Sequence, residues 1–332
     1  MIKMTLWLLG FVSFFMQGLC AYSIAFVHIG NNLPNHLYST IAQARLFNED
    51  CPIFLIANQT AIQNAKTSLR DMRVTFISCE SLPSSKAHTD FITNPEQDWG
   101  FEGLWVYSSE RFFYLEELIR QHNLSDVFHI ESDILLYANL EDLLPVFQKR
   151  YNGMIGAVFE NDHRCVPSIV YVANLEPIKA LIDFYPNKAH VFQSDMETLA
   201  DFKDRYHRVF IDFLPITVPA DGESDHPFVG ALTQTKTPEL YSNNIEEFNA
   251  IFDGAAFGIY LAGWDPRWHP QGPGTISEYS VINPSAFKLE WKVDDKGRRV
   301  PLIFYKNKQL PLINLHLTNK SAIETFLSKK IS

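Results

Sequence analysis

Nine consecutive residues join an apolar strand to a pair of carboxylates: Phe128-His129-Ile130-Glu131-Ser132-Asp133-Ile134-Leu135-Leu136. Residues two apart in extended backbone point to the same side, so Glu131 and Asp133 are expected to face one ligand while Ser132 points away. Carboxylate oxygens are hard ligands that suit Mn2+ or Mg2+. Open α/β sheets bind their ligands beyond the carboxyl ends of their strands. The segment therefore predicts a site for a metal-bound diphosphate.

The acid-x-acid spacing alone is not specific, because the chain repeats it elsewhere, at Glu96/Asp98, Glu160/Asp162, Asp195/Glu197, Asp221/Glu223 and Glu223/Asp225. The pair at 160/162 also follows a strand-like apolar run, but it leads directly into polar His163 and Arg164. Apolar residues flank the 131/133 pair on both sides. We therefore take Glu131 and Asp133 as the candidate pair. The alternative is that these acids only solvate a strand end.

Strand-like and helix-like segments alternate through the first half of the chain. Strands are expected at 24–29, 52–57, 73–78 and 126–130, and helices at 35–48, 59–69 and 108–122. This alternation predicts a sheet that is mostly parallel and has helices on both faces. Residues 79–103 are polar and contain proline, which predicts a long loop over the sheet edge.

The second half of the sequence is less regular. A short helix is expected at 139–149, strands at 153–159, 168–173 and 312–317, and a loop or lid at 215–242. The helix expected over 245–262 is broken by Gly254 and Gly258. No internal linker is evident, so we expect one domain over residues 21–332.

Composition excludes some classes of partner. The 332 residues are 46% hydrophobic and 20% charged, which is enough apolar material for a globular core. The formal net charge of -10 argues against binding of the nucleic-acid backbone, which requires clustered Lys and Arg. Any phosphate that this chain holds is therefore expected to come with a cation.

The first 20 residues have the pattern of a secretory signal peptide. Lys3 precedes an apolar run from Leu6 to Met16, and Gly18-Leu19-Cys20 supplies small residues for cleavage. The run is shorter than the roughly 20 residues that a membrane span needs. We expect a chain in the secretory pathway or outside the cytoplasm, without a stable membrane span; a leader that is not cleaved would tether it to the membrane.

Three cysteines would remain after cleavage, namely Cys51, Cys79 and Cys165. Cys51 opens one expected strand and Cys79 closes the next. In parallel strands those ends lie at opposite edges of the sheet, too far apart for a disulfide. We therefore predict no disulfide framework.

The α/β half, the carboxylate pair after the fourth strand and a late histidine together resemble the nucleotide-sugar-dependent glycosyltransferases with the GT-A fold. The likeness is strongest to the glycogenin and bacterial galactosyltransferase type, in which a helix bearing an arginine, here Arg111, precedes the acidic strand. The resemblance implies a Rossmann-like α/β fold, a mixed but mostly parallel sheet flanked by helices. Residues 21–135 would form the nucleotide-sugar-binding half and 136–332 the acceptor half. The chain departs from the usual Asp-x-Asp by placing Glu131 first.

Carried over residue by residue, the resemblance makes Asp133 the principal metal ligand and Glu131 a second ligand or a contact to the donor ribose. His316 would complete the metal shell, and Lys320 would neutralise the diphosphate leaving group. The alternatives are a histidine held inward by backbone hydrogen bonds and an ordinary lysine at a helix start.

Other candidates surround this group. Arg111 would reach the donor phosphates or base, or else pair with Glu110 or Glu131. His28 and Gly30 end the first strand, where their backbone can approach the base or ribose closely. Asp253 is the candidate catalytic carboxylate, as a general base on the acceptor hydroxyl or as a group that positions the acceptor; the alternative is a helix cap.

The acceptor platform is expected in a Pro-flanked loop that contains Trp264, Asp265 and Trp268. Indole faces pack on sugar C–H groups, and a carboxylate accepts hydrogen bonds from hydroxyls. The alternative is a loop that is pinned by its own aromatic residues.

The expected function is metal-dependent transfer of a sugar from a nucleoside-diphosphate sugar to a carbohydrate or protein hydroxyl. Mn2+ or Mg2+ would be the cofactor and a UDP-sugar the donor. Two rivals stay open: a sugar nucleotidyltransferase, whose usual cation-bearing loop after strand one is absent here, and a non-catalytic secreted carbohydrate-binding protein.

Overall fold

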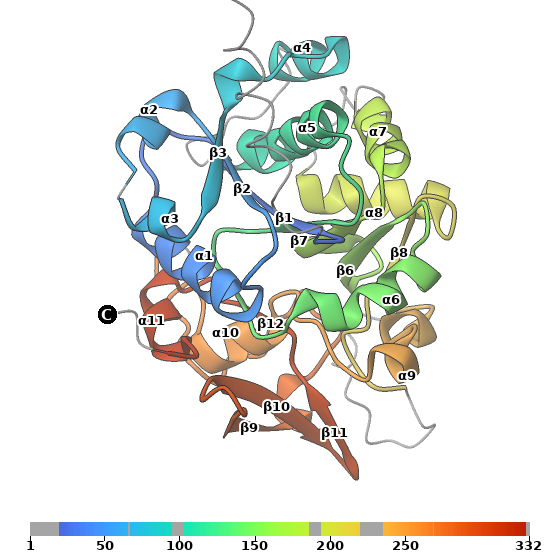
Figure 1. Ribbon diagram of the computed structural model, residues 1–332. Helices are drawn as coiled ribbons and strands as arrows, with labels where there is room; N and C mark the ends of the chain where they lie inside the picture. Colours follow the sequence, from blue (N-terminus) through green and yellow to red (C-terminus); the bar gives the residue numbers. More distant parts are fainter. Residues whose placement is uncertain are drawn as a thin grey trace, which may run out of the picture.

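The computed structural model describes residues 20–65, 67–94, 103–185, 194–219, 235–267 and 269–329. Its centre is a seven-stranded sheet with the order β3-β2-β1-β4-β7-β6-β8 (Figure 1). The strands are β1 Ser23–His28, β2 Ile53–Ala57, β3 Val74–Ser78, β4 Val127–Ile130, β6 Ile155–Asn161, β7 Arg164–Val172 and β8 Ile211–Phe213.

The sheet is mixed but mostly parallel, as predicted. Strands β3, β2, β1 and β4 run parallel, with Ile24 of β1 opposite Ile53 on one side and Phe128 on the other. Strand β7 is antiparallel to both β4 and β6, and β8 is parallel to β6. The carboxyl ends of β1 and β4 therefore lie at one edge of the sheet, where the acidic pair follows β4.

Helices cover both faces of this sheet: Figure 1 shows α5, α7 and α8 on one side and α1, α6 and α10 on the other. The α-helices are α1 Asn35–Phe47, α2 Gln59–Gln63, α3 Ser68–Asp71, α4 Lys86–Ile92, α5 Leu104–His122, α6 Leu140–Arg150, α7 Leu175–Phe184, α8 Asp195–Tyr206, α9 Ile245–Phe248, α10 Ala256–Ala262 and α11 Ile323–Phe326. Short 3-10 turns are η1 Cys79–Ser81, η4 Pro238–Ser242, η5 Pro284–Ala286 and η6 Lys320–Ala322.

A second, two-stranded sheet positions the site. Strand β5 (Ile134–Leu136) follows the acidic pair and is antiparallel to β12 (Asn314–His316), with Ile134 opposite His316. Both strands are fully buried. This pairing places a residue from near the end of the chain beside the acidic turn.

A third sheet, β9 (Lys288–Val293), β10 (Arg299–Tyr305) and β11 (Lys308–Pro311), is antiparallel and lies apart from the central sheet in Figure 1. We did not anticipate it, nor helices α7 and α8. Helix α8 had a local signal, because Ser194 and Glu197 form a capping box at its start.

Three expected elements differ from the observed ones. The helix expected over 245–262 is divided into α9 and α10, with Gly254 between them and Gly258 inside α10. The helix expected over 59–69 is divided into α2 and α3, which together bury only Ala61 and Leu69, so no continuous apolar face holds one longer helix. The loop expected over 79–103 contains η1 and α4, and Ser85 caps α4 by accepting a hydrogen bond from the amide of His88. Residues 95–102 lie outside the described part, as do 220–234 of the expected lid and most of the expected leader.

The four cysteines are free thiols in the structure, and Cys51, Cys79 and Cys165 are buried. Cys51 precedes β2 and Cys79 follows β3, as expected from the sequence. Among the described helices, none combines the length and the apolar character that a membrane crossing requires.

Candidate functional site

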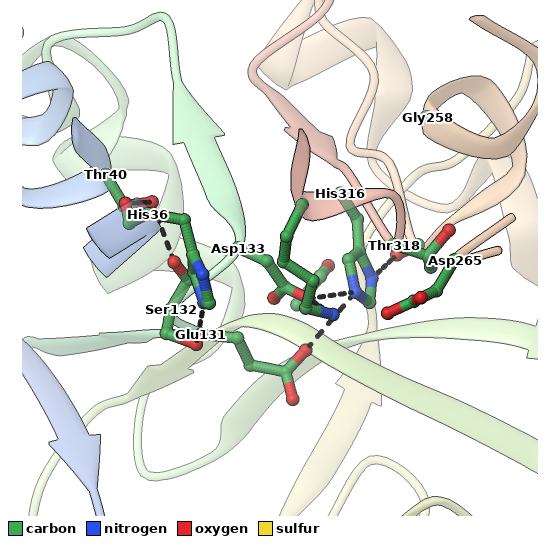
Figure 2. A network of polar contacts seen from close by, with 12 residues as sticks. His36, Thr40, Glu131, Ser132, Asp133, Gly258, Asp265, His316 and Thr318 are labelled. Carbon is green, nitrogen blue, oxygen red and sulfur yellow. Dashed lines mark hydrogen bonds and ion pairs between the residues drawn. The ribbon is translucent and has the colours of Figure 1, made fainter. Parts of the chain in front are cut away.

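The acidic pair lies in the turn between β4 and β5. The amide of Ile134 donates to the carbonyl of Glu131 (3.3 Å), so a turn, and not the extended backbone that we assumed, brings the two carboxylates to one side. Ser132 faces the other way, as predicted: its carbonyl accepts from Thr40 Oγ1 (2.8 Å) and its hydroxyl lies 3.4 Å from His36 Nε2 (Figure 2).

His316 completes a group of three ligands. Its Nε2 atom lies 3.5 Å from Asp133 Oδ2 and 4.0 Å from Glu131 Oε2. One potential ligand atom from each of the three residues lies within 4.8 Å of the others. Figure 2 shows the two carboxylates and the imidazole converging from different segments. The predicted grouping of Glu131, Asp133 and His316 is thus present in space.

The imidazole of His316 is oriented by a hydrogen bond on the side away from the carboxylates. His316 Nδ1 lies within hydrogen-bond reach of the carbonyl of Gly254, and since a carbonyl only accepts, Nδ1 carries the proton. Nε2 is then the nitrogen that faces the carboxylates. This arrangement, with one ring nitrogen anchored to a carbonyl and the other directed at acidic side chains, is typical of histidine ligands to metals.

Asp253 lies behind His316 rather than in the cavity. Its Oδ1 accepts from the amide of Phe257 (3.0 Å), and its Oδ2 accepts from the amides of Gly258 and His316 (3.0 Å each). The side chain is buried, which raises its pKa to about 6 against the opposing effect of these amides. The geometry favours the capping alternative, and a catalytic role remains a prediction.

Two cations compensate the carboxylates. Lys320 Nζ lies 2.6 Å from Asp133 Oδ2, next to the ligand group as predicted. Arg111 pairs with Glu131 and, at 2.5 Å, with Asp195 Oδ2. Arg111 does not line the cavity described below, so its observed role is to hold the carboxylate of Glu131, which was one of the alternatives.

Burial and charge shift the pKa values of these groups in different directions. Burial acts to raise the pKa of Asp133, but Lys320 and His316 outweigh it and hold that pKa well below its usual range. Burial raises the pKa of Glu131, with Arg111 opposing it. Burial acts to lower the pKa of His316, yet Asp133 raises it to about 9. In the absence of a metal the imidazole is therefore the third cation of the group.

A cavity of about 450 Å³ opens beside these residues. Glu131, His316 and Lys320 line it together with other charged side chains and with aromatic and apolar ones. Its lining consists of Leu104, Trp105, Ser108, Glu131, Glu160, Arg164, Val166, Pro167, Asp195, Met196, Ala255, Trp264, Asp265, His269, Tyr279, His316, Thr318 and Lys320. Its size and mixed lining are those of a small-molecule site.

The predicted acceptor loop is partly on this wall. Trp264 and Asp265 line the cavity, and the Trp264 ring packs against His269 with centroids 5.0 Å apart. Asp265 Oδ2 is 2.6 Å from the guanidinium of Arg267, so much of its capacity to accept hydrogen bonds is already used. Trp268 lies outside the described residues.

His28 and Gly30 lie at the carboxyl end of β1, as predicted, but do not line the cavity. His28 Nε2 is 2.8 Å from the carbonyl of Asn32, and the amide of Gly30 donates to Asn58 Oδ1 (2.6 Å). The contact of these residues with a base or ribose remains a prediction.

Sequence reasoning missed several cavity residues. Glu160 and Asp195 belong to acid-x-acid pairs that we set aside, so a signal existed for both. Ser108 donates to Asp195 Oδ1 (3.0 Å) and so joins α5 to α8. For Tyr279 and His269 the sequence carried no spacing that would have singled them out.

No family profile matches the chain, and no curated protein sequence is significantly similar to it. Among solved structures, the chain is similar to mouse xyloside xylosyltransferase 1 in its apo form, at 13% identity and a TM-score of 0.45, over 58% of this chain and 85% of that one. It is similar to the galactosyltransferase LgtC with donor and acceptor sugar analogs, at 10% identity and a TM-score of 0.41, over 58% and 73%.

A cytidylyltransferase from Leptospira borgpetersenii is also similar, at 8% identity and a TM-score of 0.38, over 59% of this chain and 76% of that one. Solved GT-A glycosyltransferases are thus among the similar structures, as the sequence led us to expect. Because each of these TM-scores is below 0.5, the roles of side chains are assigned from the contacts within this chain alone.

Proposed function

We propose that this protein is a metal-dependent glycosyltransferase that moves a sugar from a nucleoside-diphosphate sugar to a hydroxyl of a carbohydrate or protein. The observation that carries the proposal is the convergence of Glu131, Asp133, His316 and Lys320 beside a cavity that all of them except Asp133 line together with Trp264. Such a cavity offers charged groups for a diphosphate and aromatic side chains for a sugar.

The ligand group fits a divalent cation. Two carboxylates and one imidazole whose Nε2 is directed at them are donors that Mn2+ accepts, and Mg2+ prefers the oxygens. Glu131, Asp133 and His316 would hold the ion. When bound, it would supply Lewis-acid neutralisation of the charge on a departing diphosphate.

The protein's own cations have a complementary role. Lys320 is next to Asp133 and lines the cavity, so its ammonium group can pair with a phosphate oxygen once Asp133 has another partner. Arg111 is not part of the cavity lining and holds Glu131 through an ion pair. With His316 neutral, the carboxylates of Glu131, Asp133 and Asp195 exceed these two cations by one charge. A divalent ion would reverse that sign and favour an anionic ligand.

The first test is calorimetry of the protein with UDP, GDP and CMP compounds, each with Mn2+ and then with EDTA. Wild-type protein is expected to bind one nucleotide class only with the metal. Loss of an outer-shell partner costs 10- to 100-fold in metal affinity, so Asp133→Ala, which removes a direct ligand, is expected to weaken binding by about 100-fold or more. Asp142→Ala, an exposed aspartate on α6, is the matched control and should bind as wild type.

Retained metal-dependent nucleotide binding in a folded Asp133→Ala protein would contradict the metal assignment. Absence of any nucleotide binding by the folded wild type would contradict the transferase itself. Transfer activity is then measured with the nucleotide sugar that binds, by release of the free diphosphate in the presence of glycan acceptors.

A non-catalytic carbohydrate-binding protein is the second candidate, and one observation favours it. Lys320 and Arg111 already form ion pairs with Asp133 and Glu131, so much of the charge of the acidic pair is compensated by the protein itself. A binding protein that uses only the aromatic side chains of the cavity should bind glycans equally well with EDTA. The transferase should bind its nucleotide with the metal and lose that binding with EDTA. Location outside the cytoplasm belongs to either proposal, and N-terminal sequencing of the exported chain tests it.

A further inference from the structure

Glu160 is a buried carboxylate on the cavity wall that the proposed reaction has not used. It lies near the end of β6, is 3% exposed, and lines the cavity. Its Oε2 lies 3.2 Å from Arg164 Nε, whereas its Oε1 has no hydrogen-bond partner among the described residues. A buried acceptor without a partner is uncommon, because burial removes the water that would otherwise satisfy it.

The local fold explains why this acid, and not its neighbour, reaches the cavity. The pairing of β6 with β7 shifts register between Ala157 and Phe159 and again between Phe159 and Asn161. Asp162 is directed elsewhere: its Oδ1 accepts from the hydroxyls of both Thr235 (2.6 Å) and Tyr241 (2.7 Å). Asp162 therefore anchors the chain, and Glu160 keeps a free oxygen.

Glu160 is adjacent to the proposed metal group. A Cβ atom built on Gly254 would lie 3.4 Å from Glu160 Cγ, and the carbonyl of the same glycine holds the imidazole of His316. One residue thus separates the free carboxylate oxygen from the residue that would bind the metal. A sugar attached to a diphosphate at that metal, or an acceptor next to it, would lie within the same cavity.

The surroundings of Glu160 suit a sugar ring. The guanidinium of Arg164 lies 4.9 Å above the ring of Tyr279, and Tyr279 lies edge-on to Trp264 at 6.4 Å between centroids. The segment that carries Tyr279 is fixed to β6, because the amide of Val281 donates to the carbonyl of Glu160 (2.8 Å). Aromatic faces pack on sugar C–H groups, and a carboxylate accepts from sugar hydroxyls.

We propose that Glu160 is a sugar-binding residue whose Oε1 accepts a hydrogen bond from a ring hydroxyl, with Arg164 holding the carboxylate and Trp264 packing on the apolar face of the ring. This inference rests on the proposed function. The hydroxyl belongs either to the sugar of the donor or to the acceptor, which share this chemistry, and the experiment separates the two.

The test compares Glu160→Gln with wild type by calorimetry with Mn2+, using UDP, UDP-glucose, UDP-galactose, UDP-N-acetylglucosamine, GDP and GDP-mannose. The substitution keeps the shape of the side chain and removes the charge. Binding of the bare diphosphates should not change, because the phosphates would lie beside the proposed metal ligands. Binding of the sugar nucleotide that wild type prefers should weaken by about 10- to 100-fold if the donor sugar uses Glu160.

Unchanged donor binding together with a 10-fold or larger rise in the KM for the acceptor assigns the hydroxyl to the acceptor and also supports the inference. A deoxy analogue that lacks the hydroxyl is a further test, both for the donor sugar and for the acceptor. The wild-type protein should bind the analogue more weakly than the parent sugar by the same factor by which Glu160→Gln weakens binding of the parent sugar. The variant should bind the analogue and the parent sugar with nearly equal affinity. A purely structural ion pair would not produce this coupling.

Glu290→Gln on β9, outside the cavity lining, is the matched control, and thermal unfolding confirms that both variants are folded. Glu160→Gln that binds donor and turns over acceptor as wild type does would overturn the inference. If the wild-type protein binds no nucleotide, the proposed function fails. A glycan array then tests whether Glu160 binds a sugar. A glycan signal lost in Glu160→Gln supports sugar binding there, and an absent or unchanged signal overturns it.

Discussion

Asp253 is buried and both of its oxygens accept from backbone amides, which decides what the residue is able to do. The amides of Phe257, Gly258 and His316 occupy both of its oxygens, and the side chain is 1% exposed. A general base needs a free lone pair within hydrogen-bond reach of the hydroxyl that it deprotonates. The described contacts instead make Asp253 a support for His316 and for the first turn of α10.

Asp253→Asn is therefore expected to act first on stability. The amide side chain replaces one accepting oxygen by a donor that faces a backbone N–H, so the free energy of unfolding should fall by about 2–4 kcal/mol. The affinity for Mn2+ should fall with it, because the backbone of His316 loses a partner. Urea denaturation and calorimetry measure the two effects. Wild-type stability and metal affinity combined with lost transfer would instead establish Asp253 as the general base.

Helix α10 and strand β12 approach each other so closely that only glycine fits between them. A Cβ atom built on Gly258 would lie 1.8 Å from the carbonyl oxygen of His316. That oxygen belongs to the backbone of a buried strand and cannot move aside as a flexible side chain would. The contact fixes the position of His316 relative to α10, and the carbonyl of Gly254 fixes its ring.

Gly258→Ala tests this close contact. The extra methyl group forces the helix and the strand apart, and we expect a loss of about 3 kcal/mol or more in the free energy of unfolding, the upper range for overpacking. Gly272→Ala is the matched control, because a Cβ built there meets nothing within 4 Å. Thermal unfolding of the two variants makes the comparison. Equal melting temperatures would show that α10 and β12 are not in this contact.

Buried thiols lie at separate places in the molecule, and because of them the stability of the protein is expected to fall at alkaline pH. Burial raises the pKa of Cys51 to about 12, and burial together with Glu80 and Glu110 raises the pKa of Cys79 to about 12. In the unfolded chain these thiols ionise at their ordinary pKa near 8.5. Above pH 9 the unfolded state therefore holds fewer protons than the folded state, and rising pH favours unfolding.

Each of these thiols is expected to remove about 1.4 kcal/mol of stability per pH unit between pH 9 and 12. The stabilising contribution is fully present below pH 8. Urea denaturation at pH 8 and pH 10 with a reducing agent measures the slope for wild type and for Cys51→Ala. The variant should be less sensitive to pH by about the contribution of one thiol. An equal slope in both proteins would mean that Cys51 is accessible in the folded state.

Local sequence patterns were sufficient for much of the first half. Helix α1 lies within the expected 35–48, and strands β1 to β4 lie within a residue of their expected bounds. Periodicities of 3.6 and 2 residues reflect which side of one element faces the core, and that information is local. The same reasoning identified the acidic pair, the strand of His316 and the break at Gly254, whereas the break expected at Gly258 was wrong because Gly258 lies inside α10.

Contacts between distant segments were beyond such patterns. Lys320 meets Asp133 across 187 residues, and His316 reaches the same carboxylate because β12 pairs with β5. Strand pairing depends on how the whole chain packs, which no single window of sequence encodes. The GT-A resemblance brought these residues together in advance, whereas periodicity alone did not.

The two acids at 160 and 162 show the physical limit of the sequence reading. Their spacing suggests one face of one strand, yet Glu160 lines the cavity and Asp162 anchors Thr235 and Tyr241. The sequence sufficed for the class of fold and for the acidic turn, since both follow from local hydrophobic order and charge. The assignment of each carboxylate to ligand, anchor or cavity wall depended on register shifts and on partners far along the chain, which exist only after the chain has packed.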